Sequence, residues 1–175
     1  QSDEAMADLE TTIRLAPDLY DARQRRAQLL EENGKYAEAR TDYETMYQID
    51  PSQTDVLMYI ADCYQQQMDY ENAITAYNNA EKALPEYADA IAYARGVCRY
   101  SLEDFEGALA DFQKYAVAKP EDGELNFLIG SSYMNLEQEE AAESYLRKAY
   151  EQGAYLAECN FYLGSISMNR EDYKT

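Results

Sequence analysis

The sequence predicts an all-α fold, in which helical hairpins of similar length stack into a solenoid. Prolines recur at Pro17, Pro51 and Pro85, 34 residues apart each time, and Pro120 follows 35 residues later. A fixed period of about 20 to 50 residues is typical of repeat architectures. The 175 residues include only 4 prolines and 7 glycines. Because both residue types interrupt helices, their scarcity favours long helices over strands and turns.

A second landmark follows the same period. An alanine, an aromatic residue four positions later and a proline eight positions after that recur as Ala39–Tyr43–Pro51, Ala73–Tyr77–Pro85 and Ala108–Phe112–Pro120. The series begins as Ala5–Leu9–Pro17, and its last copy reads Ala142–Leu146–Ala154. Each proline is expected to end the second helix of a hairpin, because its ring cannot continue the hydrogen-bond ladder. One hairpin cannot bury both of its apolar faces, so neighbouring hairpins must stack.

These repeats resemble the tetratricopeptide repeat family over the whole chain. The family's frame places a half-repeat at 1–19, full repeats at 20–53, 54–87, 89–122 and 123–156, and a partial repeat at 157–175. The small residue that the family has at position 8 is Ala27, Ala61, Gly96, Gly130 and Gly164. The family's tryptophan at position 4 never occurs, and Arg23 occupies that position in the first full repeat. The resemblance implies a right-handed α–α superhelical solenoid of helix–turn–helix repeats, with residues 1–175 as one array.

Turn signals fall between the two helices of each expected hairpin. They read Asn33-Gly34-Lys35-Tyr36, Met68-Asp69-Tyr70, Glu103-Asp104-Phe105 and Glu171-Asp172-Tyr173. Neither end of the chain offers the polar capping element that solenoids need. We therefore expect the chain to be a segment of a longer protein.

Two positions of the repeat vary together. Position 7 holds Arg26, Ile60, Arg95, Ile129 and Leu163, and position 23 holds Asp42, Ala76, Asp111 and Tyr145 in the first four of these repeats. Arginine therefore occurs only where an aspartate faces it. We predict two ion pairs within hairpins, Arg26–Asp42 and Arg95–Asp111, because the guanidinium fork suits a partly buried carboxylate. The alternative is that these arginines bind a ligand carboxylate. Asp8 holds position 23 of the leading half-repeat, which predicts a partner arginine upstream.

The charge balance excludes some classes of partner. The chain has 34 acidic and 15 basic residues, a formal net charge of −19. A nucleic-acid partner is not expected, because phosphate binding needs a concentrated basic surface. No stretch approaches the roughly 20 apolar residues that span a bilayer, so direct membrane insertion is not expected either. The acidity either keeps the helical surface soluble or attracts basic partners.

Residues for catalysis are missing from the sequence. There is no histidine, no glycine-rich phosphate-binding pattern and no Cys-x-x-Cys pair. We expect no enzymatic activity, no cofactor and no metal. Cys63, Cys98 and Cys159 lie in helical patterns and are expected to be core residues in a reducing compartment. This predicts a cytoplasmic protein, with an exported bacterial protein as the alternative.

The resemblance also implies a binding surface. In this family, positions 2, 5, 9 and 12 of the first helices line the concave face of the solenoid. In the first full repeat these positions are polar, whereas later repeats place aromatic residues and methionines there. The predicted contact residues are Met58, Tyr59, Asp62, Tyr93, Val97, Tyr100, Phe127, Leu128, Met134, Phe161, Tyr162 and Met168. The clamp with which some members hold a chaperone's carboxylate is absent, because its positions hold Gln24, Gln28, Tyr59, Ala90 and Ala94.

The sequence therefore predicts a protein-interaction scaffold that holds a peptide or helix of a partner protein. Exposed apolar clusters with an acidic rim favour a basic or amphipathic partner. A downstream helix of the same protein could instead cover this surface. Two further functions remain open: self-association as a homo-oligomer, and a regulatory or targeting arm of an enzyme outside this segment.

Overall fold

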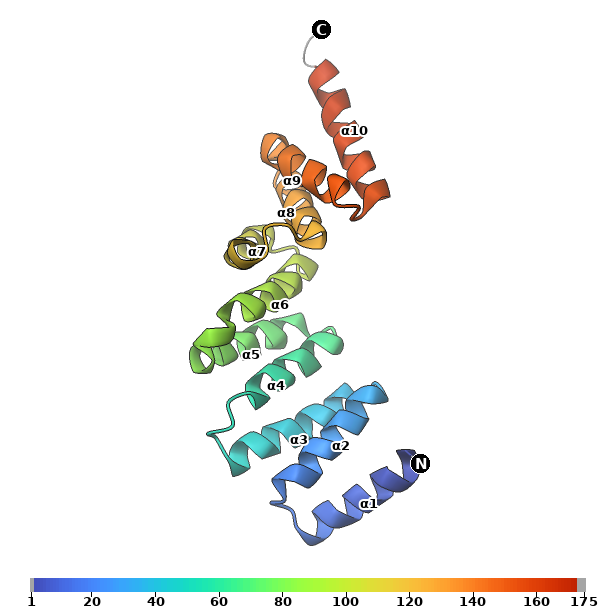
Figure 1. Ribbon diagram of the computed structural model, residues 1–175, viewed down its shortest axis with the longest axis vertical. Coiled ribbons are helices and arrows are strands. Elements are labelled where there is room, and N and C mark those ends of the chain that lie inside the picture. Colours follow the sequence, from blue (N-terminus) through green and yellow to red (C-terminus); the bar gives the residue numbers. More distant parts are fainter. Residues whose placement is uncertain (1, 173–175) are drawn as a thin grey trace. The chain divides into compact units, whose positions relative to one another are not determined.

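The chain is almost entirely helical (Figure 1). The computed structural model describes residues 2–172, with side chains from 4 to 170. This part of the chain holds ten α-helices, one short 3-10 helix and no strand, which confirms the all-α prediction. The helices up to the middle of the chain are α1 (Ser2–Leu15), α2 (Tyr20–Glu32), α3 (Tyr36–Ile49), α4 (Val56–Gln66), α5 (Tyr70–Ala83), η1 (Pro85–Tyr87) and α6 (Ala88–Ser101). They are followed by α7 (Phe105–Ala118), α8 (Gly123–Asn135), α9 (Glu139–Glu151) and α10 (Leu156–Asp172).

The chain divides into two compact units, Gln1–Ile91 and Ala92–Thr175, and the division falls within α6. In the first unit each helix from α1 to α5 packs against the next (Figure 1). In the second unit α7 packs against α8, α8 against α9, and α9 against α10. Each full repeat of the predicted frame contains two helices joined by a short turn. The right-handed superhelix implied for the whole chain stays a prediction.

The two helices of a hairpin approach closely at the small residues. Ala27 and Ala39 are fully buried in the first unit. In the second unit, a Cβ added at Gly96 would lie 2.8 Å from the ring of Phe112, and one at Gly130 would lie 2.8 Å from Cγ of Leu146. Position 8 must therefore be small so that position 24 of the second helix can pack on it. At the corresponding Gly164 of α10, an added Cβ would meet no atom within 4 Å.

The core of each unit is built from the same repeat positions. In the first unit the buried cluster consists of Ala27, Leu30, Ala39, Tyr43, Met46, Val56 and Cys63. The second unit has one cluster around Phe112, Leu125 and Ile129, and another around Leu146, Cys159 and Ile166. All three cysteines are buried and free, so the expectation that they are core residues is confirmed.

The turns within hairpins place one residue in the left-handed region. After α2 this residue is Gly34, with φ of +71°. After α4, α6 and α8 it is Met68, Glu103 and Glu137, with φ between +58° and +61°. The turn expected at 171–173 is wrong for its first two residues, because α10 continues to Asp172. Tyr173 lies outside the described residues. No helix of the described chain is long and apolar enough to cross a membrane.

Candidate functional site

The predicted pair in the first unit is present as part of a larger ion cluster. The carboxylate of Asp42 is fully buried. Arg26 donates to it twice, from Nε at 2.6 Å and from Nη2 at 2.7 Å. Arg23 donates a third bond, from Nη1 at 2.9 Å, and also caps the carbonyl oxygen of Pro17 from Nε. The bonds to Asp42 raise the pKa of Arg26 above its ordinary value, although burial opposes them.

The second unit repeats this arrangement around Asp111. Arg95 donates from Nε at 2.9 Å and from Nη2 at 2.7 Å, and its side chain is 4% exposed. Arg99 donates from Nη1 at 2.9 Å and also bonds the carbonyl oxygen of Gly107. With Arg95 buried and doubly bonded to Asp111, the geometry favours the structural role over binding of a ligand carboxylate.

The second arginine of each cluster was missed by the sequence reasoning. Arg23 occupies position 4 and Arg99 occupies position 11, three residues before and four residues after position 7. Residues three or four apart lie on the same face of a helix, so either can reach the same carboxylate. The signal that could have found them was an arginine one turn away from position 7 in the two hairpins that carry the aspartate.

In the first unit, the hydroxyls of two buried tyrosines form hydrogen bonds with polar side chains of the first helices. The Tyr43 hydroxyl donates to Oε2 of Glu31 at 2.8 Å. The Tyr77 hydroxyl lies 2.6 Å from Oδ1 of Asp62 and 2.6 Å from Oε1 of Gln65. Burial raises the pKa of Asp62 above its ordinary value, and the bond to Tyr77 only partly offsets this. Asp62, predicted as a partner contact, therefore corresponds to a residue that joins α4 to α5.

A cavity of about 500 Å³ opens in the first unit near the starts of α2 and α4. Its lining residues are Tyr20, Asp21, Gln24, Ile49, Asp50, Gln53, Asp55, Val56 and Tyr59. Tyr59 is 42% exposed, and its ring stacks on that of Tyr43 at 5.2 Å. The pKa of Tyr20 is raised, first by burial and then by the charges of Asp50 and Asp55. Of the predicted contacts in this unit, Tyr59 is therefore accessible, and Met58 is half-buried.

In the second unit, Phe127 is a core residue. Its ring stacks on Tyr155 with centroids 4.3 Å apart and 16° between the planes, and Phe127 is only 9% exposed. Tyr155 therefore covers Phe127, one of the predicted contact residues, and the contact of Phe127 with a partner stays a prediction. Tyr155 has φ of +48°, a left-handed conformation that is unusual for an aromatic residue. The sequence reasoning did not single out Tyr155, because the turn before α10 lacks the proline of the other repeats.

Tyr155 belongs to a cluster of tyrosines around Glu124. The charge of Glu124 is the largest cause that raises the pKa of Tyr155. Burial and then Glu124 raise the pKa of Tyr93 to about 12. The proximity of Tyr100 also raises the pKa of Tyr155 and Tyr162. Glu124 therefore lies near Tyr155 and Tyr93, and Tyr100 lies near Tyr155 and Tyr162. We call these four tyrosines and Glu124 the Glu124 cluster.

The other predicted contacts of the second unit differ in exposure. Phe161 and Met168 are 73% and 68% exposed and lie seven residues apart on α10, so they share one helix face. The remaining residues are half-buried and pack against the core clusters: Val97, Tyr100, Leu128, Met134 and Tyr162. Among the predicted contacts of this unit, the most accessible apolar side chains are therefore Phe161 and Met168 on α10.

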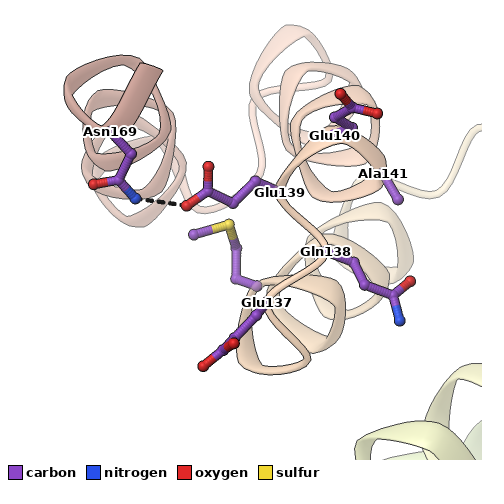
Figure 2. A pocket seen from close by; sticks show the side chains of 7 residues that line it. Glu137, Gln138, Glu139, Glu140, Ala141 and Asn169 are labelled. Atoms are coloured by element: carbon purple, nitrogen blue, oxygen red, sulfur yellow. Dashed lines mark hydrogen bonds between the residues drawn. The ribbon is translucent and has the colours of Figure 1, made fainter. Parts of the chain in front are cut away.

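A separate acidic pocket of about 770 Å³ lies in the second unit at the turn between α8 and α9. It is lined by Met134, Glu137, Gln138, Glu139, Glu140, Ala141 and Asn169. Figure 2 shows the Asn169 amide directed at the Glu139 carboxylate, to which it donates a hydrogen bond of 2.5 Å. Glu137 and Glu140 extend in other directions (Figure 2). Within the described residues no group of three acidic, cysteine or histidine side chains could hold a metal ion.

Comparisons with known proteins agree with this architecture. Three models, each described as Tetratricopeptide repeat, match residues 1–54, 30–96 and 123–152. A search of curated protein sequences found no match.

Three solved structures illustrate the shared fold. Residues 41 to the end of MamA from Desulfovibrio magneticus RS-1 are 19% identical, with a TM-score of 0.79 over 89% of this chain and 87% of that one. The C-terminal part of a TPR repeat-containing protein from Cytophaga hutchinsonii is 17% identical, with a TM-score of 0.78 over 98% and 67%. YrrB, described as a TPR protein with an unusual peptide-binding site, is 21% identical, with a TM-score of 0.75 over 93% and 84%. At these identities the likeness shows the fold alone, an all-α solenoid of helical hairpins.

Proposed function

Because this chain belongs to the tetratricopeptide repeat family, we propose that it is a protein-interaction scaffold that binds a peptide or helix of a partner protein on the first-helix side of its hairpins. The family's repeat is typically an interaction module without catalytic activity. The buried charged residues form two arginine–aspartate clusters. Each cluster joins the two helices of one hairpin, through Arg26–Asp42 or Arg95–Asp111. These four charged side chains are therefore engaged within the protein and not available to a substrate.

The Glu124 cluster is the observation that carries this proposal. Glu124 is exposed and lies near Tyr155 and Tyr93, and among the described residues its carboxylate interacts with tyrosine hydroxyls and with no lysine or arginine. Tyrosine rings contribute large contact area and can interact with a cation through their faces. A lysine or arginine side chain would therefore gain both a carboxylate and aromatic neighbours at this place.

The chemistry around the cluster favours a basic or amphipathic partner. Glu158 also raises the pKa of Tyr155, and Asp122 raises that of Tyr93, so the negative potential extends beyond Glu124. Phe161 and Met168 supply exposed apolar area on α10 in the same unit. An amphipathic helix with lysine or arginine beside its apolar stripe would match both features. YrrB, described as a TPR protein with an unusual peptide-binding site, is a precedent for peptide binding on this fold.

Self-association is the second candidate, since exposed apolar area such as Phe161 could also be buried against another copy. A nucleic-acid partner is not proposed, because the net charge of −19 opposes it. We propose a cytoplasmic location, because three buried free thiols suit a reducing compartment.

The test is a capture experiment with two matched charge reversals. The variant Glu124→Lys reverses the charge at the centre of the cluster, near the start of α8. Glu140→Lys, at an exposed position near the start of the second helix α9, makes the same change at the other end of this hairpin. Wild type and Glu140→Lys should retain the same partner from source-cell lysate, and Glu124→Lys should lose it while its circular dichroism stays unchanged. Equal retention by all three proteins would place the binding surface elsewhere.

A further inference from the structure

The cavity of about 500 Å³ near the starts of α2 and α4 combines aromatic and acidic side chains. Its tyrosines are Tyr20 and Tyr59, and its acidic residues are Asp21, Asp50 and Asp55. Burial, and then the proximity of Asp50, Asp55, Tyr59 and Asp21, raise the pKa of Tyr20, so these four groups lie near its hydroxyl. All of them belong to the first unit, and none lies at an end of the chain.

Both tyrosine rings of this cavity are held in place by the core. Tyr20 is half-buried and packs against the core cluster of the first unit. Tyr59 stacks on the buried ring of Tyr43, with centroids 5.2 Å apart and 28° between the planes, and it keeps 42% of its surface exposed. A ligand would therefore meet aromatic walls that are already ordered, which lowers the entropic cost of binding.

The carboxylates of this cavity lack a cation. Asp50 accepts hydrogen bonds from Ser52 and from Gln53, and these bonds lower its pKa and keep it charged. Asp21 and Asp55 are exposed, and neither forms an ion pair with any lysine or arginine of the described chain. Asp55 directly precedes α4, but its side chain makes no capping hydrogen bond. At least two negative charges are therefore available to a ligand.

The helical hairpins do not require this combination of side chains. One repeat further along the chain, different residues stand at four of these positions: Thr54, Leu84, Ala90 and Ala94 in place of Tyr20, Asp50, Asp55 and Tyr59. The helices α4, α5 and α6 form with those residues. Because the fold does not explain the aromatic and acidic residues of the first unit, their combination in one cavity points to a ligand.

We propose that this cavity binds a lysine or arginine side chain of a partner polypeptide. Asp21 and Asp55 pair with the cation, and the rings of Tyr20 and Tyr59 contact its methylene stem and its charged end. A second copy of the chain is a poor occupant, because two chains with a net charge of −19 repel each other. The inference rests on the proposed function in the basic character of the partner, but it concerns the first unit and not the Glu124 cluster.

The test titrates the isotope-labelled chain with blocked tripeptides and follows its nuclear magnetic resonance spectrum. The probes are acetyl-Gly-Lys-Gly-amide and its arginine counterpart, and the control carries norleucine, which has an apolar stem without the charge. The amide signals of Gln24 and Gln53, which line the cavity, should shift and saturate with a charged probe. At about 0.15 M salt, where distant surface charges are screened, norleucine should bind at least about tenfold more weakly.

Three variants assign the binding to the cavity. Asp21→Asn/Asp55→Asn removes both unpaired charges with little change of shape, and it should weaken the charged probe at least about tenfold. Glu71→Gln removes an exposed carboxylate from the first turn of α5 in the same unit, outside the cavity, and should leave binding unchanged. Tyr59→Leu keeps an apolar side chain beside Tyr43 but loses the ring face, so binding should weaken about threefold. Circular dichroism checks that each variant folds.

The proposal is overturned if no charged probe saturates the signals of Gln24 and Gln53, if norleucine binds as tightly, or if Asp21→Asn/Asp55→Asn binds like wild type. It is also overturned if sedimentation shows that the chain self-associates and that this double variant does not, because the occupant is then a second copy. None of these outcomes depends on the capture experiment with Glu124→Lys, since the probes are defined and the cavity lies in the other unit.

Discussion

The hairpins α6–α7 and α8–α9 use the same backbone plan but are held together differently. In α6–α7, a buried carboxylate at Asp111 gathers Arg95 and Arg99 across the hairpin. In α8–α9 the corresponding positions are Ile129 and Tyr145, and Tyr145 stacks on Tyr133 at 5.8 Å. The two kinds alternate along the chain, since α2–α3 has the ion cluster and α4–α5 has Ile60 with Ala76.

A hairpin of this fold can therefore close with or without a buried charge pair. A buried ion pair gains little net free energy over apolar packing, because both charges lose their hydration. Removing only one member of the pair is costly, however, because the other charge then stays buried without compensation. A single substitution at position 7 or 23 should therefore lower the free energy of unfolding more in a charged hairpin than in an apolar one.

The largest expected effect is that of Asp111→Ala. Removing the carboxylate deprives the buried Arg95 of both hydrogen bonds to Asp111 and of its counter-charge, so the free energy of unfolding should fall by about 3–5 kcal/mol. Urea unfolding followed by circular dichroism measures the loss. Glu106→Ala, at an exposed position on the same helix, should change stability by less than about 0.5 kcal/mol. Equal losses for the two variants would mean that the ion cluster does not hold α6 to α7.

Converting the charged hairpin into the apolar kind should recover part of this loss. The double variant Arg95→Ile/Asp111→Ala reproduces the Ile60–Ala76 combination of α4–α5. It should lose less stability than the sum of the two single variants, by about 1–3 kcal/mol, because no buried charge remains unpaired at position 7. The measurement is a double-mutant cycle by urea unfolding. Additive losses would rule out the pairing.

The apolar hairpin should be sensitive to volume at its small residue. Gly130→Ala places a Cβ 2.8 Å from Leu146, so it should lower the free energy of unfolding by about 1–3 kcal/mol through overpacking. Gly164→Ala makes the same change where no atom lies within 4 Å, and it should raise stability by about 0.5–1 kcal/mol through helix propensity. Thermal unfolding distinguishes the two. A loss at Gly164 like that at Gly130 would show that close packing is not the cause.

A buried thiol on α4 should make the apolar hairpin α4–α5 sensitive to alkaline pH. Burial, and then Glu31, raise the pKa of Cys63 from about 9 to about 12. The folded state therefore keeps the proton that the unfolded state releases, and stability is lost as pH rises from about 9 towards 12. Between about pH 8 and pH 10 the loss from this thiol should be about 1 kcal/mol. Cys63→Ala should show a smaller loss over the same range in urea unfolding; an identical pH profile would contradict the assignment.

The smallest expected effect concerns the turns. The charged hairpin α2–α3 has Gly34 at its left-handed position, whereas the apolar hairpin α4–α5 has Met68 with φ of +59°. Met68→Gly should raise the free energy of unfolding by about 0.5–1 kcal/mol, because a side chain disfavours this conformation. Gly34→Ala should lower it by a similar amount, since an added Cβ at Gly34 meets open space and only the backbone is strained. Thermal unfolding checks both signs, and equal signs would contradict the backbone argument.

Much of the fold could be predicted from the sequence because its signals are periodic. The prolines and the alanine–aromatic pairs mark the hairpins α2–α3, α4–α5 and α6–α7, and the structure confirms the all-α fold. The Arg26–Asp42 pair could be predicted, because arginine at position 7 of the repeat occurs only together with aspartate at position 23. Arg23 and Arg99 could not be assigned in the same way, because they occupy positions 4 and 11, where no other repeat has arginine.

The candidate surface was harder to predict, because exposure depends on neighbours that lie outside the repeat pattern. Phe127 sits at a position expected to face a partner, but Tyr155 from the following turn covers it. Asp62 is predicted as a partner contact, and its carboxylate lies 2.6 Å from the Tyr77 hydroxyl. In both cases an aromatic side chain from another segment contacts a residue of the predicted surface, and helical spacing alone does not describe such a contact.

The arginine–aspartate clusters also determine where this chain can be cut and rejoined. Each cluster is closed within one hairpin, between α2 and α3 or between α6 and α7. A crossover in the loops after α3 or α7 would move whole hairpins and keep every charge with its partner. A crossover in the turns at Gly34 or Glu103 would join an arginine helix to a helix without the aspartate. For shuffled or redesigned arrays built from these modules, the loops after α3 and α7 are therefore the permissive recombination points.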